Sequence, residues 1–313
     1  MRYGGFGRTG LTISTVSMGC NRLGDPGGDP AQWPPIVERA LELGVTLFDT
    51  SISYNQGRSE AIVGEVTAQH AGLTHVTTKV GFNIDFELGP AHQIRDYSAA
   101  AMFRDVDGQL QRLRRETIDA YMLHSAKLND LETGDWAVAV ESLKKSGKIR
   151  AFGVSVDDDA TGLYAIEHGA DVLQIEYDLL TPGAEDQLLP AALKHNVGIM
   201  VKTPLARGLL TGKFPPGQAI PPEQQWRRPR GDRLQLRLGR IEQLRFLERP
   251  GQTLAQAALR FVIAHPAVHC AVPGARTIEQ LEANLPAADG DLTSDELARI
   301  KKLHAEWRAE GAW

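Results

Sequence analysis

Short apolar runs alternate with helix-like segments along almost the whole chain. Eight runs rich in Val, Ile, Leu and Ala indicate β-strands at residues 15–20, 45–49, 75–79, 120–124, 149–154, 172–177, 197–202 and 268–272. The runs are mostly continuous, without a regular apolar–polar alternation, which is typical of parallel strands that are covered on both faces. The pattern therefore predicts a parallel sheet covered by helices.

Segments with the helical spacing of apolar residues lie between these runs. They are predicted at residues 34–43, 59–69, 98–115, 135–146, 157–168, 184–195, 254–264, 277–285 and 293–305. The segments 81–97, 125–134 and 203 to about 240 lack this period and are predicted as loops, the last one dense in Pro, Gly and Arg. At the N-terminus a glycine-bounded turn at 7–10 separates two short stretches, which predicts a β-hairpin.

Eight successive strand–helix units in one chain predict an α/β fold, a single (β/α)8 TIM barrel that spans residues 1–313 as one domain. The N-terminal β-hairpin and one additional C-terminal helix would flank the barrel. A doubly wound open sheet is the alternative. It normally carries a glycine-rich nucleotide loop after its first strand, and Gly19-Cys20-Asn21-Arg22-Leu23-Gly24 does not match that loop.

Composition and charge narrow the class of protein. The chain has 313 residues, of which 42% are hydrophobic and 23% charged, so it can bury a large core. Its formal net charge of −5 argues against nucleic acid as a partner, and the basic run 226–233 is interpreted as a solvated loop. Cys20 and Cys270 lie in apolar runs, so we expect buried free thiols and no metal site. With no signal-peptide core and no membrane-spanning run, we expect a soluble, cytoplasmic protein.

Three of the predicted strands end in one ionisable residue each, namely Asp49, Lys79 and His124, and Tyr54 follows shortly after the first. The carboxyl ends of barrel strands share one rim, so we expect the four side chains to meet there. An isolated tyrosine, with a pKa of roughly 10, is a poor acid at neutral pH. A lysine beside its oxygen would lower that pKa, an aspartate would keep the lysine charged, and the histidine could donate a hydrogen bond to a carbonyl. These residue types predict proton transfer, with a redox agent supplied from outside.

The same segments resemble the catalytic motifs of the aldo-keto reductase superfamily. The resemblance is carried by Phe48-Asp49-Thr50 with Tyr54, Gly57-Arg58-Ser59-Glu60, Thr78-Lys79-Val80-Gly81 and Leu123-His124, and by the segments 7–11 and 147–155. It extends over almost the whole chain. It implies that Tyr54 is the general acid, that Lys79 and Asp49 tune it, and that His124 orients the substrate carbonyl.

The resemblance also implies a site for NADP(H), with NAD(H) less favoured, across the top of the barrel. Ser155 and Gln174 would bind the nicotinamide carboxamide, and the loop 203–213 would follow the pyrophosphate. Arg276 suits a 2′-phosphate by its charge and its place near a helix start. The implied cofactor-binding residues are Ser155, Gln174, Lys202, Pro204, Leu205, Gly208, Lys213, Gly274, Arg276, Gln280 and Asn284.

Two positions depart from the family pattern. Val156 stands where most relatives have Asn, and Lys202 stands where many have an aromatic residue that stacks on the nicotinamide. A cation against the ring would disfavour the oxidised, positively charged nicotinamide, so one hypothesis is that Lys202 favours the reduced cofactor. The other hypothesis is that Lys202 turns away and pairs with a carboxylate such as Glu176.

The sequence therefore predicts an NADP(H)-dependent oxidoreductase that reduces an aldehyde or ketone, with a small carbonyl compound or sugar as substrate and Tyr54 as the acid. One alternative is the oxidative direction, as an aldose or alcohol dehydrogenase. A second is a non-catalytic, nicotinamide-binding regulatory subunit. A third is a Schiff-base aldolase that uses Lys79, although Asp49 and Tyr54 would then have no obvious role.

Overall fold

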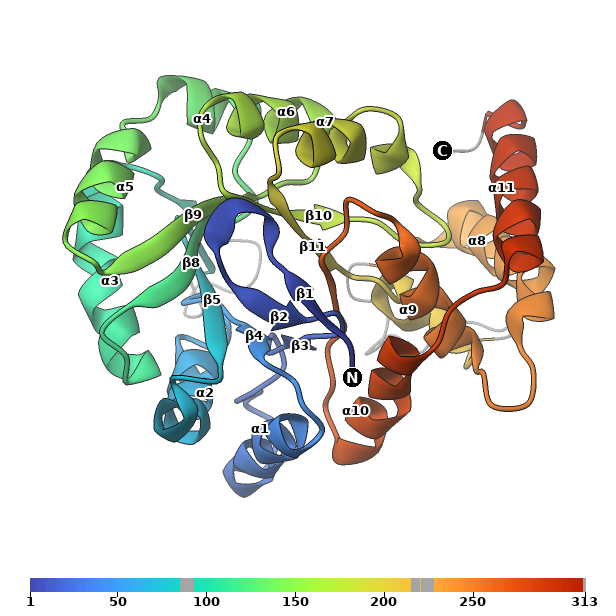
Figure 1. Cartoon of the computed structure of the whole chain (residues 1–313), viewed down its shortest axis with the longest axis horizontal. Helices are drawn as coiled ribbons and strands as arrows, with labels where there is room; N and C mark the ends of the chain where they lie inside the picture. The colour runs from blue at the N-terminus through green and yellow to red at the C-terminus, as the bar shows by residue number, and fades with distance from the viewer. Residues whose placement is uncertain (85–92, 215–219, 221–227, 312–313) are drawn as a thin grey trace.

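A closed barrel of parallel strands forms the centre of the molecule (Figure 1). The computed structural model describes residues 1–84, 93–214, 220 and 228–311. The barrel strands are β3 (Met18–Gly19), β4 (Leu47–Asp49), β5 (His75–Val80), β8 (Ile118–Leu123), β9 (Ile149–Ser155), β10 (Val172–Glu176), β11 (Gly198–Lys202) and β12 (Cys270–Val272). They pair in this order, and a bridge between Gly19 and Gly274 links β3 to the end of β12. The eight-stranded (β/α)8 barrel that the sequence predicts is confirmed.

Helices surround the barrel on its outer face (Figure 1). They include α1 (Trp33–Glu42), α2 (Arg58–Thr67), α3 (Ala99–Leu113), α5 (Trp136–Lys145), α6 (Asp159–Glu167), α7 (Leu188–Lys194), α9 (Leu254–Ala264), α10 (Ile278–Asn284) and α11 (Ser294–Ala309). Residues with the right side chains start them: Ser98 caps α3, and Thr293 forms a capping box with Glu296 in α11. The additional C-terminal helix is confirmed as α11.

Four elements lie in segments that the sequence pattern predicted as loops: α4 (Leu128–Thr133), β6 (Phe82–Ile84), β7 (Gln93–Arg95) and α8 (Gly231–Gln243). The loop prediction was wrong there for physical reasons. The helix α4 has only 6 residues, too few to show a period, and β7 is exposed at every position. In α8 the buried stripe of Leu234, Leu238 and Ile241 is diluted by Arg and Gly residues.

The N-terminal hairpin seals one end of the barrel. Its strands β1 (Tyr3–Gly5) and β2 (Thr12–Ser14) are antiparallel and lie across the barrel in Figure 1. Phe6 and Ile13 are fully buried and cluster with the inward side chains of the strands. Gly198 permits this close approach, because a Cβ there would lie 2.8 Å from the Phe6 ring. The hairpin therefore leaves the C-terminal ends of the strands as the accessible face of the barrel.

The two thiols of the chain are buried. Cys20 and Cys270 form no disulfide, as predicted. Burial raises the pKa of Cys270 to about 12 and also raises that of Cys20, so neither thiol is a nucleophile at neutral pH. Within the described ranges, no helix combines the length and the apolar character that a bilayer crossing requires.

One buried carboxyl group, that of Asp178, lies two residues beyond β10. Its Oδ1 accepts a hydrogen bond from the backbone N–H of Leu180 (2.7 Å), while Oδ2 has no hydrogen-bond partner in the described part of the chain. Burial raises the pKa of Asp178 from 3.8 to about 7. In the unfolded chain the group ionises near pH 4, so folding becomes less favourable as the pH rises from about 4 to about 7.

Replacing Asp178 with asparagine is expected to stabilise the protein most at alkaline pH. The amide keeps the shape and carries no charge, so the free energy of unfolding should rise by about 4 kcal/mol at pH 8 and by less than half as much at pH 5. Urea denaturation at both pH values measures this. Asp295→Asn, at an exposed position of α11, is the matched control and should change little. An equal effect of D178N at both pH values would contradict the expectation.

Candidate active site

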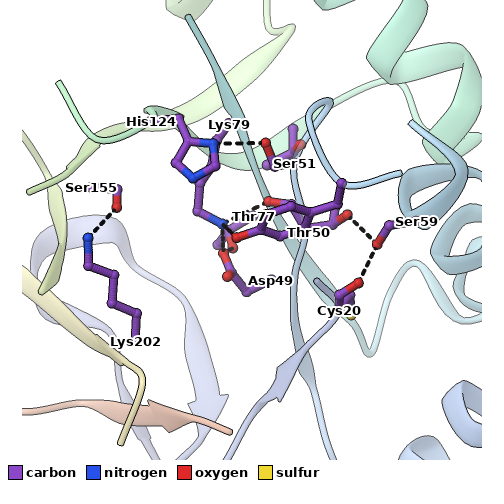
Figure 2. A network of polar contacts seen from close by, with 12 residues as sticks. Cys20, Asp49, Thr50, Ser51, Ser59, Thr77, Lys79, His124, Ser155 and Lys202 are labelled. Carbon is purple, nitrogen blue, oxygen red and sulfur yellow. Dashed lines mark hydrogen bonds and ion pairs between the residues drawn. The ribbon is translucent and has the colours of Figure 1, made fainter. Parts of the chain in front are cut away.

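Asp49 and Lys79 form a buried ion pair at the C-terminal end of the barrel (Figure 2). They lie on the neighbouring strands β4 and β5, where Asp49 is in register with Thr77. The ammonium group of Lys79 donates to Asp49 Oδ1 (2.7 Å), to the Thr50 carbonyl (2.8 Å) and to the Tyr54 hydroxyl (3.4 Å). Thr77 Oγ1 also donates to Asp49 Oδ1 (2.7 Å). Lys79 is completely buried, so its charge depends on these acceptors.

A left-handed turn presents Tyr54 to the site. Tyr54 lies in the loop between β4 and α2, and the next residues Asn55, Gln56 and Gly57 have φ values of 52°, 59° and 77°. Residues other than glycine adopt this backbone conformation only at a cost in free energy, about 1–3 kcal/mol for each residue. A hydrogen bond from Asn55 Nδ2 to the Leu23 carbonyl (2.8 Å) holds the turn in place.

The pKa of Tyr54 differs from the one expected from the sequence. Burial raises the pKa of Tyr54, and this effect outweighs the lowering by Lys79, so the predicted net lowering was wrong. Burial alone would lower the pKa of Lys79, but Asp49 and Tyr54 raise it overall. Tyr54 is therefore protonated at neutral pH, and the adjacent cation would stabilise a phenolate at this position.

His124 lies beside Tyr54. It directly follows β8, and its ring is edge-on to Tyr54 (5.7 Å between centroids) and to Phe82 (5.3 Å). Its Nδ1 is 3.2 Å from the hydroxyl oxygens of both Ser51 and Ser53. The structure therefore brings the four predicted residues together at one rim of the barrel, from β4, β5, β8 and the loop after β4.

Ser155 and Gln174 lie next to each other on the same rim. They are in register on the paired strands β9 and β10, and both are buried. Gln174 Nε2 has no hydrogen-bond partner among the described residues. Val156, which follows Ser155, is buried in the apolar core and donates only its backbone N–H to the Gln174 carbonyl (2.9 Å).

Lys202, at the end of β11, turns toward Ser155 (Figure 2). Its ammonium group donates to Ser155 Oγ (3.1 Å) and to Asp157 Oδ1 (2.7 Å). Burial lowers the pKa of Lys202, and Asp157 partly offsets this. Lys202 therefore pairs with a carboxylate, as one of the two hypotheses held, but its partner is Asp157 and not the suggested Glu176. Glu176 instead accepts from Thr203 Oγ1 (3.2 Å) and pairs with Arg207 (3.4 Å).

The segment after β11 forms a compact left-handed turn. Pro204 and Leu205 lead into the 3₁₀-helical turn Ala206–Thr211, in which Gly208 has a φ of 85° and donates its N–H to the Leu205 carbonyl (2.8 Å). Gly212 ends the turn, and Lys213 comes next. Gly208 suits this conformation, and its lack of a side chain leaves the backbone accessible.

Basic side chains gather on the side of the rim formed by β3, β11 and β12. The members are Arg22, Arg207, Lys213, Arg228 and Arg276, which we call the basic cluster. Burial first, and then the neighbouring cations, lower the pKa values of Arg22, Lys213 and Arg228. The cluster therefore holds mutually repelling charges, which an anion would relieve.

The remaining predicted cofactor residues lie around α10. Gly274 is bridged to Gly19 of β3, and a Cβ at Gly274 would lie 3.1 Å from Asn21 Oδ1. Arg276 is exposed, and its backbone N–H donates to Gln280 Oε1 (3.0 Å). Asn284 is buried at the end of α10. Of the basic run 226–233, residues 226 and 227 lie outside the described ranges.

Sequence reasoning missed several polar residues of this region: Ser51, Ser53, Asp157 and Arg22. Asp157 could have been found, because it follows Ser155 by two residues at the end of β9. The serines carry no comparable signal, because their contact with His124 depends on the path of the loop.

The molecule combines a closed barrel with Tyr, Lys, Asp and His side chains at its strand ends. Comparison with known protein families identifies the class of protein that has this combination. A model described as the aldo/keto reductase family matches residues 15–305. The chain belongs to this family of oxidoreductases, whose members bind nicotinamide cofactors.

Individual relatives align over nearly the full chain. The holo form of aldo-keto reductase AKR11C1 from Bacillus halodurans superposes with a TM-score of 0.81 at 30% identity, covering 97% of this chain and 96% of that one. The glycerol dehydrogenase AKR11B4 from Gluconobacter oxydans gives a TM-score of 0.79 at 28% identity, with 95% and 93% covered. The NADH-specific methylglyoxal reductase of Escherichia coli is 27% identical, with 95% and 96% covered.

Proposed function

We propose that this protein is an NADP(H)-dependent oxidoreductase that reduces an aldehyde or ketone to an alcohol. The observation that carries the proposal is the buried ammonium of Lys79, held by Asp49 and only 3.4 Å from the Tyr54 hydroxyl. When bound, a reduced nicotinamide supplies a hydride. Tyr54 then donates its proton to the carbonyl oxygen, Lys79 stabilises the resulting phenolate, and Asp49 keeps the lysine charged.

His124 would complete the site by donating a hydrogen bond to the same carbonyl oxygen. Its ring lies beside that of Tyr54, so one oxygen atom could be within reach of both side chains. A donor aimed at this oxygen would stabilise the negative charge that develops on it during reduction. The cation of Lys79 and the donor of His124 thus act on different atoms, the first on the acid and the second on the substrate.

The residues present fit a nicotinamide cofactor. Gln174 Nε2 is a buried donor without a partner in the described part of the chain, and the hydroxyl of Ser155 lies on the neighbouring strand. A carboxamide oxygen would satisfy this donor, which otherwise costs free energy. Lys202 already donates to Ser155 Oγ, so the serine proton is available to a ligand. Because Asp157 balances the charge of Lys202, the structure favours the hypothesis of a carboxylate pair over that of a cation against the ring.

The basic cluster supports NADP(H) over NAD(H). Within it, Arg22 pairs with Asp25 (3.4 Å) and Arg207 pairs with Glu176 (3.4 Å). The other members have no ion pair within the described ranges: Lys213, Arg228 and Arg276. A pyrophosphate together with a 2′-phosphate would supply the anions that these three cations lack.

Replacing Arg276 with alanine is expected to weaken NADPH binding by about tenfold to a hundredfold, the range for a hydrogen bond to a charged group. NADH binding should change little, because NADH has no 2′-phosphate. Titration with each nucleotide, followed by tryptophan fluorescence, measures both affinities. The control is Arg104→Ala, which removes a cation from the exposed side of α3. An equal loss of affinity for both nucleotides would mean that Arg276 does not contact the 2′-phosphate. Wild-type protein that binds NADH alone would contradict the proposal.

The oxidative direction is the second candidate, because one structural neighbour is a glycerol dehydrogenase. The same residues serve in reverse, with Tyr54 accepting the proton of an alcohol. Two rates compare the directions: reduction of methylglyoxal with NADPH, and oxidation of glycerol with NADP⁺. The ratio of these two rates identifies the favoured direction. Cofactor binding without turnover on any carbonyl or alcohol would instead favour a regulatory subunit.

A further inference from the structure

A triangle of polar groups lies behind the catalytic histidine. The hydroxyl oxygens of Ser51 and Ser53 are each 3.2 Å from His124 Nδ1 and 2.9 Å from each other. The backbone N–H of Ser53 also donates to Ser51 Oγ (3.2 Å). Ser51 is completely buried and Ser53 is 7% exposed, so water does not readily replace any of these bonds. The proposed function uses His124 but assigns no role to either serine.

The proton count of the triangle decides between the two neutral forms of the imidazole. Each serine has one proton to donate, and neutral imidazole carries its proton on one nitrogen only. If Ser53 donates to Ser51 and Ser51 donates to Nδ1, both hydroxyl protons are used. If instead Nδ1 carried the proton, it would donate to the serines, and one hydroxyl proton would have no acceptor within the triangle. Ser51 Oγ also accepts from the backbone N–H of Ser53, but neither hydroxyl proton has another acceptor in the described part of the chain, and a buried donor without a partner is costly.

We infer that Ser51 and Ser53 are positioning residues that hold His124 in the tautomer with its proton on Nε2. Figure 2 shows the imidazole with Nδ1 turned toward Ser51, so that Nε2 lies on the opposite side of the ring. The inference rests on the proposed function, because the tautomer matters for catalysis only if Nε2–H is the donor to the carbonyl oxygen. The serines then make His124 a neutral donor of fixed orientation, and no carboxylate is needed to orient it.

A third serine of the same region provides a matched control. Ser59 is completely buried, donates to the Cys20 carbonyl (2.7 Å) and shares a hydrogen bond with Thr50 Oγ1 (2.8 Å), as Figure 2 shows. Ser59→Ala therefore removes a buried hydroxyl from the region without removing a partner of His124. Any effect of the serines that is only structural should appear in this variant as well.

The test is ¹⁵N NMR of the full-length protein labelled at histidine, with the His124 signals assigned by their loss in His124→Asn. In the wild type, Nδ1 should show the shift of an unprotonated nitrogen and Nε2 that of an N–H. In the double variant S51A/S53A the two shifts should move toward each other as both tautomers become populated. The kcat for aldehyde reduction should fall about tenfold, as for loss of one buried hydrogen bond, with the Kd for NADPH unchanged. Ser59→Ala should leave the shifts as they are.

A proton on Nδ1 in the wild type would overturn the inference. So would a double variant that keeps both the ¹⁵N shifts and the kcat, or a Ser59→Ala variant that changes the shifts equally. Failure of the proposed function gives a different result, namely wild-type protein without NADPH binding or turnover. The shifts report the tautomer in either case, because they require neither cofactor nor substrate.

Discussion

Tyr54→Phe is expected to lower kcat for carbonyl reduction by about a hundredfold to ten-thousandfold, the usual contribution of a general acid. The substitution removes one oxygen atom, the one 3.4 Å from the ammonium of Lys79, and leaves the ring in place. The ion pair of Lys79 with Asp49 does not depend on this oxygen, so the fold and NADPH binding should persist. Steady-state rates with saturating NADPH, together with fluorescence titration, measure the two effects separately.

Tyr164→Phe is the matched control for this variant. Tyr164 lies on α6, where its ring stacks on His168 away from the four-residue site. The Tyr164→Phe variant should reduce carbonyl compounds at the wild-type rate. If Tyr54→Phe kept most of its activity, another group would have to donate the proton, and the proposed role of Tyr54 would be lost.

Lys79→Met is expected to remove activity and also to destabilise the fold by about 3–5 kcal/mol, the cost of leaving one charge of a buried pair without its partner. Asp49 is only 5% exposed. Of the two side-chain hydrogen bonds to Asp49 described above, this variant would keep only the one from Thr77. Methionine has nearly the length of the lysine stem, so the loss arises from the charge and not from a cavity. The free energy of unfolding in urea and the rate of carbonyl reduction are the two measurements.

The double variant K79M/D49N separates stability from catalysis. It contains no buried charge at these positions, so much of the lost stability should return. Activity should stay absent, because the tyrosine then lacks the cation that stabilises its phenolate. A double variant as unstable as K79M alone would show that the lysine contributes through packing and not through its charge.

Much of the barrel could be predicted because its signal is local. The strands are buried on both faces, so each one appears as a continuous apolar run such as Ile118–Leu123. A run that ends in an ionisable residue at the C-terminal rim also predicts the candidate site, since that rim is shared by all the strands. Elements that bury little, such as β7, or whose apolar stripe is diluted, such as α8, give no such signal.

The parts of the site that sequence could not predict depend on contacts between distant segments. The pKa of Tyr54 depends on how deeply its loop is buried, and no pattern of residues reports this. Lys202 and Glu176 face each other in the sheet register, yet Lys202 crosses to Asp157 while Glu176 pairs with Arg207. The direction of each side chain decides its ion-pair partner, and the sequence does not determine that direction.

The seal formed by β1 and β2 has a consequence for proton traffic. Phe6 and Ile13 fill the base of the barrel with apolar side chains, and an apolar plug of this kind disfavours a chain of water molecules from that end to Lys79. If Tyr54 is the acid, as proposed, its proton would be restored from solvent at the C-terminal rim, the same side from which the substrate would enter. Reprotonation of the proposed acid would then follow the departure of the product from that rim.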